Sequence, residues 1–206
     1  MKKLYLAPLL LISSLLSNLS SANDFDVKND WYYEGLNKPT KETTIHITNP
    51  AGEALQKIQT QFNEEGFISS ITYDEDLQQI FEPYQGKTRT MKFAYEAAGE
   101  EHSQTLTTQW LQANHVRFDD GDLVIDTFYD DKGNAIRREL FLDGTETPEE
   151  VIEYQYLDNS TQSTDPTNQV VIINLEYDQY GNWVKQSEEN PYDQRIIRTR
   201  TIEYYP

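Results

Sequence analysis

The sequence contains no cysteine among its 206 residues. Disulfides therefore cannot stabilise the fold, and both a thiol nucleophile and a cysteine-linked lipoprotein anchor are excluded. The chain also lacks a Gly-x-Ser-x-Gly elbow, a phosphate-binding glycine loop and a His-Glu-x-x-His zinc motif, which are local signatures of large enzyme classes. These absences favour a non-catalytic protein whose stability comes from an apolar core or from continuous strand pairing.

Long hydrophobic runs are scarce. One apolar stretch extends from Leu4 to Leu16, after Lys2 and Lys3 and before a small, polar segment that ends at Ala22. It is shorter than the roughly 20 residues that cross a bilayer, and this order of segments is typical of a secretory signal peptide. We predict a signal peptide over residues 1–22 and one exported domain over 23–206, periplasmic or extracellular. A single membrane anchor is the alternative.

Basic residues are also few, 17 against 35 acidic ones. Cleavage after residue 22 would remove Lys2 and Lys3, which leaves 15 basic residues and a net charge of −20. Such a chain repels nucleic acid and anionic lipid, so we expect neither as a partner and no membrane insertion after cleavage. The 12% aromatic content is too high for a disordered acidic tail. We therefore predict a folded acidic protein.

A short turn motif recurs along the chain. Asn or Asp is followed within three positions by glycine and then by residues suited to a strand. The side chain of Asn or Asp accepts a hydrogen bond from backbone two residues on, and glycine tolerates the positive φ that returns the chain to the ladder. Each copy therefore predicts a hairpin tip. The six copies are Thr48–Gly52, Phe62–Gly66, Phe118–Gly121, Tyr129–Asn134, Leu142–Gly144 and Tyr177–Asn182.

The segments between these turns alternate between two faces, as in Val171, Ile173 and Leu175, which is the period of a strand. The run from Ala54 to Phe62 also satisfies helical spacing, but it lies between two turn motifs, and we predict a strand there. Polar stretches over 97–104, 143–150 and 158–168 are rich in turn residues, and we predict longer hairpin loops there. The predicted fold is all-β, an antiparallel meander of repeated hairpins in an extended, twisted sheet, either open or partly closed.

The two best copies, Tyr129-Asp130-Asp131-Lys132-Gly133-Asn134 and Tyr177-Asp178-Gln179-Tyr180-Gly181-Asn182, resemble the tyrosine-aspartate (YD) repeats of bacterial RHS-type cell-surface proteins. The resemblance implies a bacterial envelope setting and a long antiparallel sheet of consecutive hairpins. In that family long arrays can close into a shell. This chain has few copies, and we expect too few to enclose a space.

The residue pattern gives little support for a metal site or for catalysis by a pair of carboxylates. Counting an EF-hand loop from Asp119 puts Val124 at position six and Asp130 at position twelve, where glycine and glutamate are required. A looser calcium site among the turn carboxylates is the alternative. The three histidines show no metal-ligand spacing, and no cofactor is predicted. A pair of catalytic carboxylates would leave no local signature.

Aromatic and arginine residues are the candidate partner-binding residues. Aromatics on an open sheet can form a platform for a sugar or a partner's side chains, and they can equally be cross-strand packing pairs. Arg198 and Arg200 share one face at period two, where they could bind an anion or pair with Glu153 and Glu176. The candidate set is Trp31, Tyr32, Tyr33, Trp183, Tyr192, Arg198 and Arg200.

Three functional hypotheses follow. The first is a non-catalytic binding or scaffolding module of the bacterial envelope that recognises a basic protein or a carbohydrate. The second is a periplasmic immunity or inhibitor protein against a basic toxin or hydrolase, because negative charge suits a basic target. The third is a carboxylate-dependent hydrolase, which predicts a concave cleft with two close acids, one of them desolvated.

Overall fold

The computed structural model describes residues 25–74, 77–97, 100–142, 144–165, 169–189 and 195–206, with the side chains of 95–97 and 100–103 excepted. The signal peptide predicted over 1–22 and the candidate residue Tyr192 lie outside this part of the chain.

One short helix, α1 (Asp30–Tyr33), precedes a run of strands that pair antiparallel in chain order. The strands are β1 (Thr40–Thr48), β2 (Ala54–Phe62), β3 (Ile68–Tyr73), β4 (Leu77–Phe81), β5 (Thr88–Ala97), β6 (Glu100–Gln112), β7 (His115–Asp119), β8 (Leu123–Tyr129), β9 (Ala135–Leu142), β10 (Glu150–Leu157), β11 (Ser160–Thr164), β12 (Gln169–Tyr177), β13 (Trp183–Glu189) and β14 (Arg195–Tyr204).

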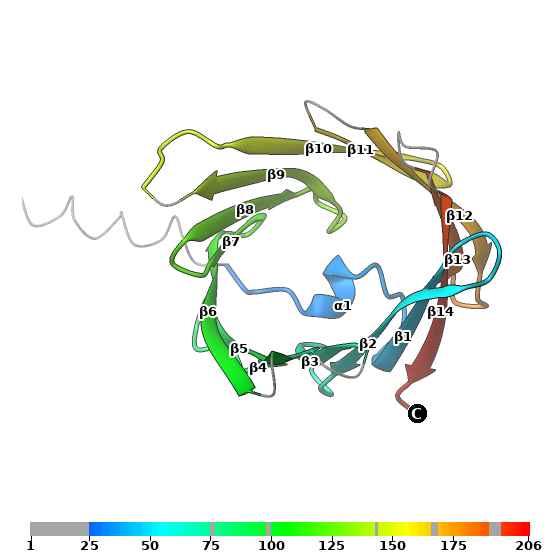
Figure 1. Cartoon of the computed structure of the whole chain (residues 1–206), viewed down its shortest axis with the longest axis horizontal. Helices are drawn as coiled ribbons and strands as arrows, with labels where there is room; N and C mark the ends of the chain where they lie inside the picture. Colours follow the sequence, from blue (N-terminus) through cyan, green and yellow to red (C-terminus); the bar gives the residue numbers. More distant parts are fainter. Residues whose placement is uncertain (1–24, 75–76, 98–99, 143, 166–168, 190–194) are drawn as a thin grey trace, which may run out of the picture.

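The first and last strands pair with each other, so the sheet closes into a barrel (Figure 1). At this seam Thr43 lies opposite Ile202 and Ile45 opposite Arg200. The predicted all-β antiparallel meander is confirmed, and so is the strand at Ala54–Phe62. The expectation that the hairpins are too few to enclose a space was wrong, because right-handed twist carries the long meander round until its edges meet.

Two of the predicted loops were also wrong in part. β6 begins at Glu100, within the loop predicted over 97–104, and β11 (Ser160–Thr164) lies within the one predicted over 158–168. Their polar residues can belong to strands because alternate positions on a barrel face water. Of the loop predicted over 143–150, the described residues 144–149 are outside strands, and Glu150 begins β10.

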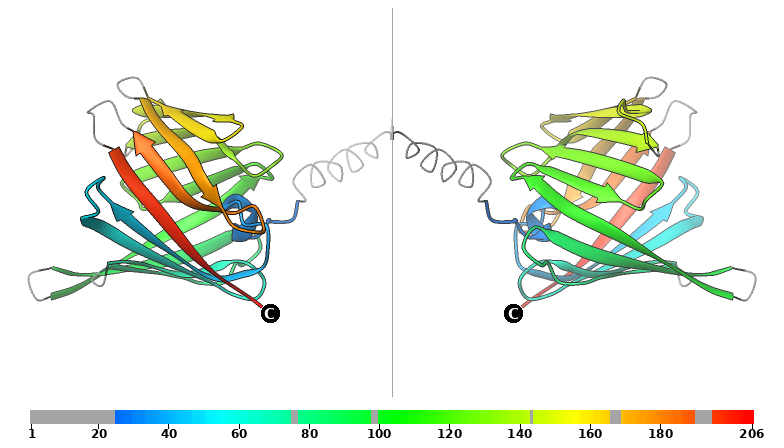
Figure 2. Two further views of the ribbon diagram at one scale, coloured as in Figure 1. Left: turned by 90° about the vertical axis from the view of Figure 1, so that its right-hand side faces the viewer. Right: turned by 90° about the vertical axis from the view of Figure 1, so that its left-hand side faces the viewer.

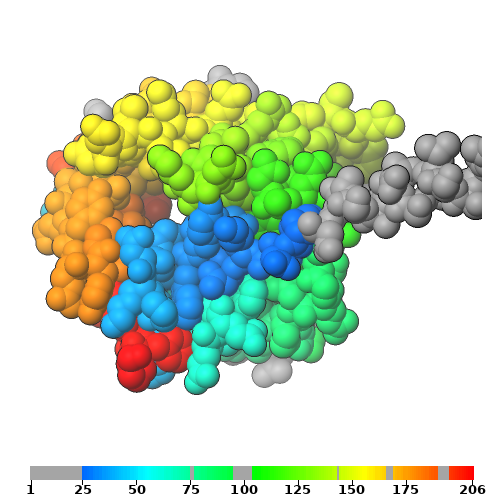
Figure 3. Space-filling view, turned by 180° about the vertical axis from the view of Figure 1, so that it is seen from behind, coloured from blue at the N-terminus to red at the C-terminus, as the bar shows by residue number. Residues whose placement is uncertain are grey.

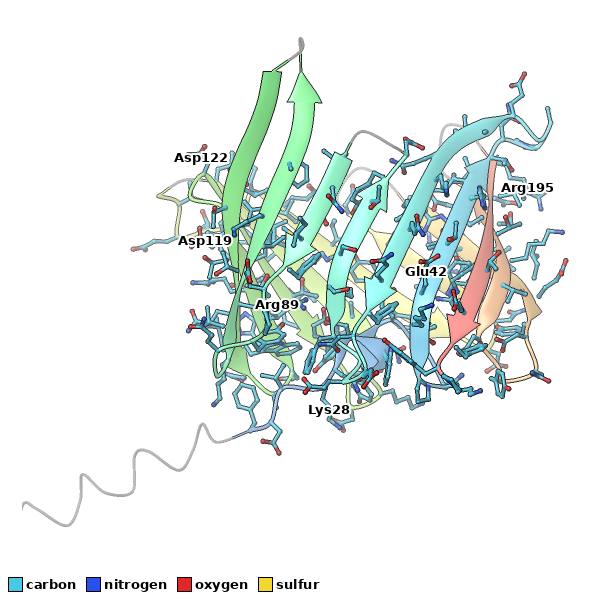
Figure 4. All side chains as sticks on the ribbon, turned by 90° about the horizontal axis from the view of Figure 1, so that it is seen from below. Lys28, Glu42, Arg89, Asp119, Asp122 and Arg195 are labelled. Carbon is cyan, nitrogen blue, oxygen red and sulfur yellow. The ribbon has the colours of Figure 1, made fainter. Side chains whose placement is uncertain are left out.

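Alternate turns lie at the same end of the barrel because neighbouring strands are antiparallel. One end, here called the plugged end, is crossed by residues 25–39, here called the plug segment, which includes α1 (Figures 1 and 2). In Figure 4, Lys28 marks the plugged end and Arg195 the opposite, open end. β5 and β6 extend beyond the other strands at the open end (Figure 2).

The interior of the barrel, here called the lumen, is not filled by a dense core. Of the described residues, the buried hydrophobic ones are Leu36, Phe62, Met91, Leu106 and Trp110. Barrels of about eight strands are just narrow enough for side chains to fill them, whereas wider barrels enclose cavities. Figure 3 shows the plugged end, where an opening remains between the plug segment, in blue, and the yellow-green part of the wall.

Candidate binding site inside the barrel

Three copies of the turn motif lie together at the plugged end. The carboxylate of Asp130 accepts hydrogen bonds from the backbone N–H groups of Lys132 and Asn134 at 2.9 and 2.8 Å. Asp178 and Asn63 accept the equivalent pairs in their own turns. Burial alone would raise the pKa of Asp130 and Asp178, but the hydrogen bonds that their carboxylates accept outweigh it and lower both pKa values.

The glycines of these turns make room for the plug segment. A Cβ at Gly66 would lie 2.6 Å from the Trp31 ring, and one at Gly133 would lie 2.5 Å from the Tyr32 ring. Backbone and side-chain hydrogen bonds join the same elements: the N–H of Trp31 donates to the carbonyl of Gly66 at 3.2 Å, and the hydroxyl of Tyr32 donates to the carbonyl of Asp131. The turns therefore clamp the plug segment as well as join strands.

A buried ion pair fixes α1 to the wall. Asp30 accepts two hydrogen bonds from the Arg89 guanidinium of β5, at 2.9 and 3.4 Å, and a third from the backbone N–H of Ile68 at 2.6 Å. The two side chains are 12% and 7% exposed. The Asn29 side chain caps α1 by accepting from the N–H of Tyr32 at 3.3 Å.

The predicted aromatic cluster Trp31, Tyr32 and Tyr33 lies on α1 rather than on the sheet, and the three residues are half-buried. Tyr33 stacks on Trp110 at a centroid distance of 4.9 Å, and Trp31 contacts Tyr205 edge-on at 6.2 Å. Burial raises the pKa of Tyr33 well above its usual value, and the neighbouring tyrosines add to this effect. Two of the three rings thus contact aromatic residues of other parts of the chain.

Arg198 and Arg200 share the inward face of β14, as predicted, but their partners differ from those predicted. Arg198 pairs with Glu188 of β13. The Nε of Arg200 donates to the carbonyl of Trp183 at 2.9 Å, and its guanidinium lies 3.9 Å from the centroid of the Trp183 ring. The structure thus brings together two of the predicted residues, Trp183 and Arg200.

The predicted pairing with Glu153 and Glu176 was wrong. Glu153 belongs to β10, which is not adjacent to β14. β12, which carries Glu176, is likewise separated from β14 by β13, and Glu176 instead pairs with Lys185 at 3.1 Å. The meander order itself separates both strands from β14, so the expected pairing was inconsistent with the predicted hairpin order.

Sequence reasoning missed Glu34 and Arg138, whose charges act on each other inside the barrel. Glu34 directly follows α1 and is exposed, yet desolvation raises the pKa of its carboxyl, and Arg200 and Arg138 oppose that rise. The Glu34 side chain is accessible inside the lumen, yet the surrounding wall reduces the hydration of its carboxyl. Exposure and a raised pKa are therefore compatible. No spacing or composition signal distinguishes Glu34 from the other acidic residues of the chain.

Register places Arg138 on the lumen face. It lies opposite Thr127, which lies opposite Val116, which lies opposite Trp110, and Trp110 contacts α1 through Tyr33. Arg138 also lies 5.9 Å from the centroid of the Tyr154 ring. Its side chain makes no hydrogen bond or ion pair with the other residues that the structure describes.

On β1 to β3 the two faces of the wall differ in polarity. Ile45, Ile58 and Ile71 are on the lumen face of β1 to β3 and only half-buried, whereas the alternate positions carry His46, Gln59 and Thr72. Further round the barrel, the lumen-facing and half-buried residues include Phe93, Ile125, Leu140, Ile152 and Ile172. The lumen face is therefore largely apolar, and no packed core covers its half-buried aliphatic side chains.

Among the paired strand residues that the structure describes, the cations of the lumen face are arginines, whereas the outer face carries lysines together with Arg117, Arg137 and Arg195. Arg89, Arg138, Arg198 and Arg200 face the lumen, whereas Lys57, Lys92 and Lys185 are on the outer face of β2, β5 and β13. Arginine is the cation suited to buried pairs and to bidentate recognition of carboxylate or phosphate, while lysine is more strongly hydrated. The lumen thus combines an apolar lining with cations of the anion-binding type.

Within the described residues, no group of three or more His, Asp or Glu side chains is placed to hold a metal ion. No helix in that part of the chain is long and apolar enough to cross a bilayer. No protein-family model matches the chain, and a search of the curated proteins finds no match.

Proposed function

We propose that the mature chain is an exported binding module of the bacterial envelope that holds an apolar or amphipathic small molecule in the lumen of its barrel. We retain a non-catalytic binding role, and the site lies on the inner face of the closed sheet instead of on a face of an open one. One observation carries it: the lumen-facing aliphatic side chains are only half-buried.

Apolar side chains that remain accessible inside a protein favour an apolar occupant, because transfer of such surface out of water is favourable by about 25 cal/mol per Å². Binding sites for small molecules are typically concave, mostly apolar and provided with a few placed polar groups. The lumen is largely apolar, with Glu34, Arg138 and Arg200 among its polar groups. The outer face of β1 to β3 is polar, which suits a water-facing wall around an apolar interior.

Lumen-filling variants test the proposal. Thr161 and Ser163 of β11 face the lumen opposite Tyr156 and Tyr154, whereas Ser160 and Gln162 alternate with them on the outer face. The double variant T161W/S163W should weaken binding of the neutral fluorescent probe N-phenyl-1-naphthylamine about tenfold, which is about 1.4 kcal/mol. The matched control S160W/Q162W adds the same rings outside and should bind like the parent.

The measurement is a fluorescence titration of residues 23–206, with circular dichroism to confirm that both variants fold. Equal losses in the two variants would place the probe on the outer surface and contradict the proposal. Absence of binding by the parent chain would also contradict it.

A carboxylate-dependent hydrolase is the second candidate, and the raised pKa of Glu34 favours it. Asp30 is the nearest acid on the same segment, but its carboxylate is held by Arg89 and by the N–H of Ile68. Glu34 therefore lacks a free carboxylate partner on the plug segment, and we rank binding above hydrolysis.

A further inference from the structure

We propose that the lumen binds an amphiphile with an anionic head group, a long-chain carboxylate or phosphate monoester, whose head group lies between Arg200 and Arg138. This inference deepens the proposed function and rests on it. It names the polar end of the ligand, which an apolar lining alone does not specify.

Arg200 provides a buried and incompletely used donor. The residue is 5% exposed, its Nε is occupied by the carbonyl of Trp183, and its Nη2 is buried without a hydrogen-bond partner among the described residues. Buried polar atoms of this kind are normally paired. Burial also lowers the pKa of Arg200 to about 10, so the guanidinium is still charged at neutral pH.

Arg138 provides a second cation from the opposite part of the wall. It belongs to β9, whereas Arg200 belongs to β14, and both act electrostatically on the carboxyl of Glu34. No ion pair within 4 Å joins Glu34 to either arginine in the described part of the chain. The guanidiniums therefore face the same space without being neutralised by direct contact.

The charge of this group of residues favours an anion. Asp30 and Arg89 neutralise each other in a direct pair, and Asp178, which also acts on Arg200, is engaged by Tyr204 and by its own turn. Glu34 is then a single carboxylate beside two cations, Arg138 and Arg200. A carboxylate or phosphate oxygen can accept two N–H bonds from one guanidinium. Attraction of an anion is confined to the lumen, because most acidic residues lie on the outside of the chain and repel free anions.

The tail of the ligand would lie along the aliphatic wall. From Arg200 toward the open end, the lumen face of the neighbouring strand β1 presents Ile45 and Ile47. A free inorganic anion would leave this surface uncovered. The combination therefore points to an amphiphile and not to free phosphate.

Variants of three residues test the inference by displacement of N-phenyl-1-naphthylamine from the full mature chain. Palmitate and hexadecyl phosphate should displace the probe at lower concentration than 1-hexadecanol, and inorganic phosphate should not displace it. R138Q should weaken palmitate binding about tenfold, the scale of a lost charge-assisted hydrogen bond, and leave 1-hexadecanol unchanged. R137Q is the matched control, because Arg137 is the outward neighbour and pairs with Glu139.

E34Q supplies a change in the opposite direction that misfolding cannot imitate. Removal of the competing carboxylate should tighten palmitate binding several-fold and leave 1-hexadecanol unchanged. The head-group inference is overturned if palmitate and 1-hexadecanol bind alike in all variants, or if inorganic phosphate alone displaces palmitate. In both cases probe binding would persist, which separates this failure from failure of the proposed function.

Discussion

At the scale of single residues, glycine in the turn motif has two separate roles. Gly133 and Gly121 both adopt positive φ, +85° and +96°, but a Cβ at Gly133 would meet the Tyr32 ring at 2.5 Å, while one at Gly121 would meet open space. Positive φ explains why glycine recurs in the motif. Only the close approach explains why the plug segment fits at this end of the barrel.

Alanine at these two positions should separate the roles. G121A should lower the free energy of unfolding by about 1–2 kcal/mol, the cost of a left-handed backbone for a residue with a Cβ. G133A carries the same cost and must also displace Tyr32, so it should lose at least about 1 kcal/mol more. Urea unfolding followed by fluorescence measures both. Equal losses of unfolding free energy in G121A and G133A would mean that Tyr32 can move aside without an energetic cost.

At the scale of elements, the plug segment is held chiefly by polar contacts from the wall and the turns. The Asp30–Arg89 pair is the most buried of these contacts. D30A would leave the Arg89 guanidinium buried without its counter-ion, and loss of one partner of a buried pair costs about 3–5 kcal/mol. We expect that loss in the free energy of unfolding.

The double variant D30A/R89M should recover part of the stability lost in D30A, because it removes the uncompensated charge and keeps apolar volume beside Phe81 and Tyr84. D26A is the control, since Asp26 is an exposed acid of the same segment. A double variant as unstable as the sum of D30A and R89M would show that the pair is not coupled.

At the scale of the whole molecule, a thin wall carries a large excess of negative charge. Repulsion among these charges acts against the closed barrel and is screened over about 30 Å at 0.01 M salt but about 8 Å at 0.15 M. The melting temperature of residues 23–206 should therefore rise by several degrees as NaCl increases over this range. Calorimetry measures it, and a constant or falling melting temperature would contradict the expected repulsion.

How far the sequence could predict the molecule differs between its parts. Asp130 with Gly133, and Asp178 with Gly181, predicted hairpin tips because the hydrogen bonds and the positive φ arise within five residues. The partners of Arg198 and Arg200 were not predictable in the same way. They depend on the register of β13 against β14, which sets the residues that lie beside each arginine.

The sequence by itself determined the elements: turns made by local side chains, strands of period two, an antiparallel order that follows from short connections, and an acidic surface. The tertiary structure decided what those elements enclose. Closure of β1 on β14 converts one face of the sheet into a lumen, and the plug segment brings Glu34 to the same space as Arg138 and Arg200. Local patterns record contacts within a hairpin, whereas closure and the lumen depend on twist summed over the whole sheet and on contacts between residues far apart in the chain.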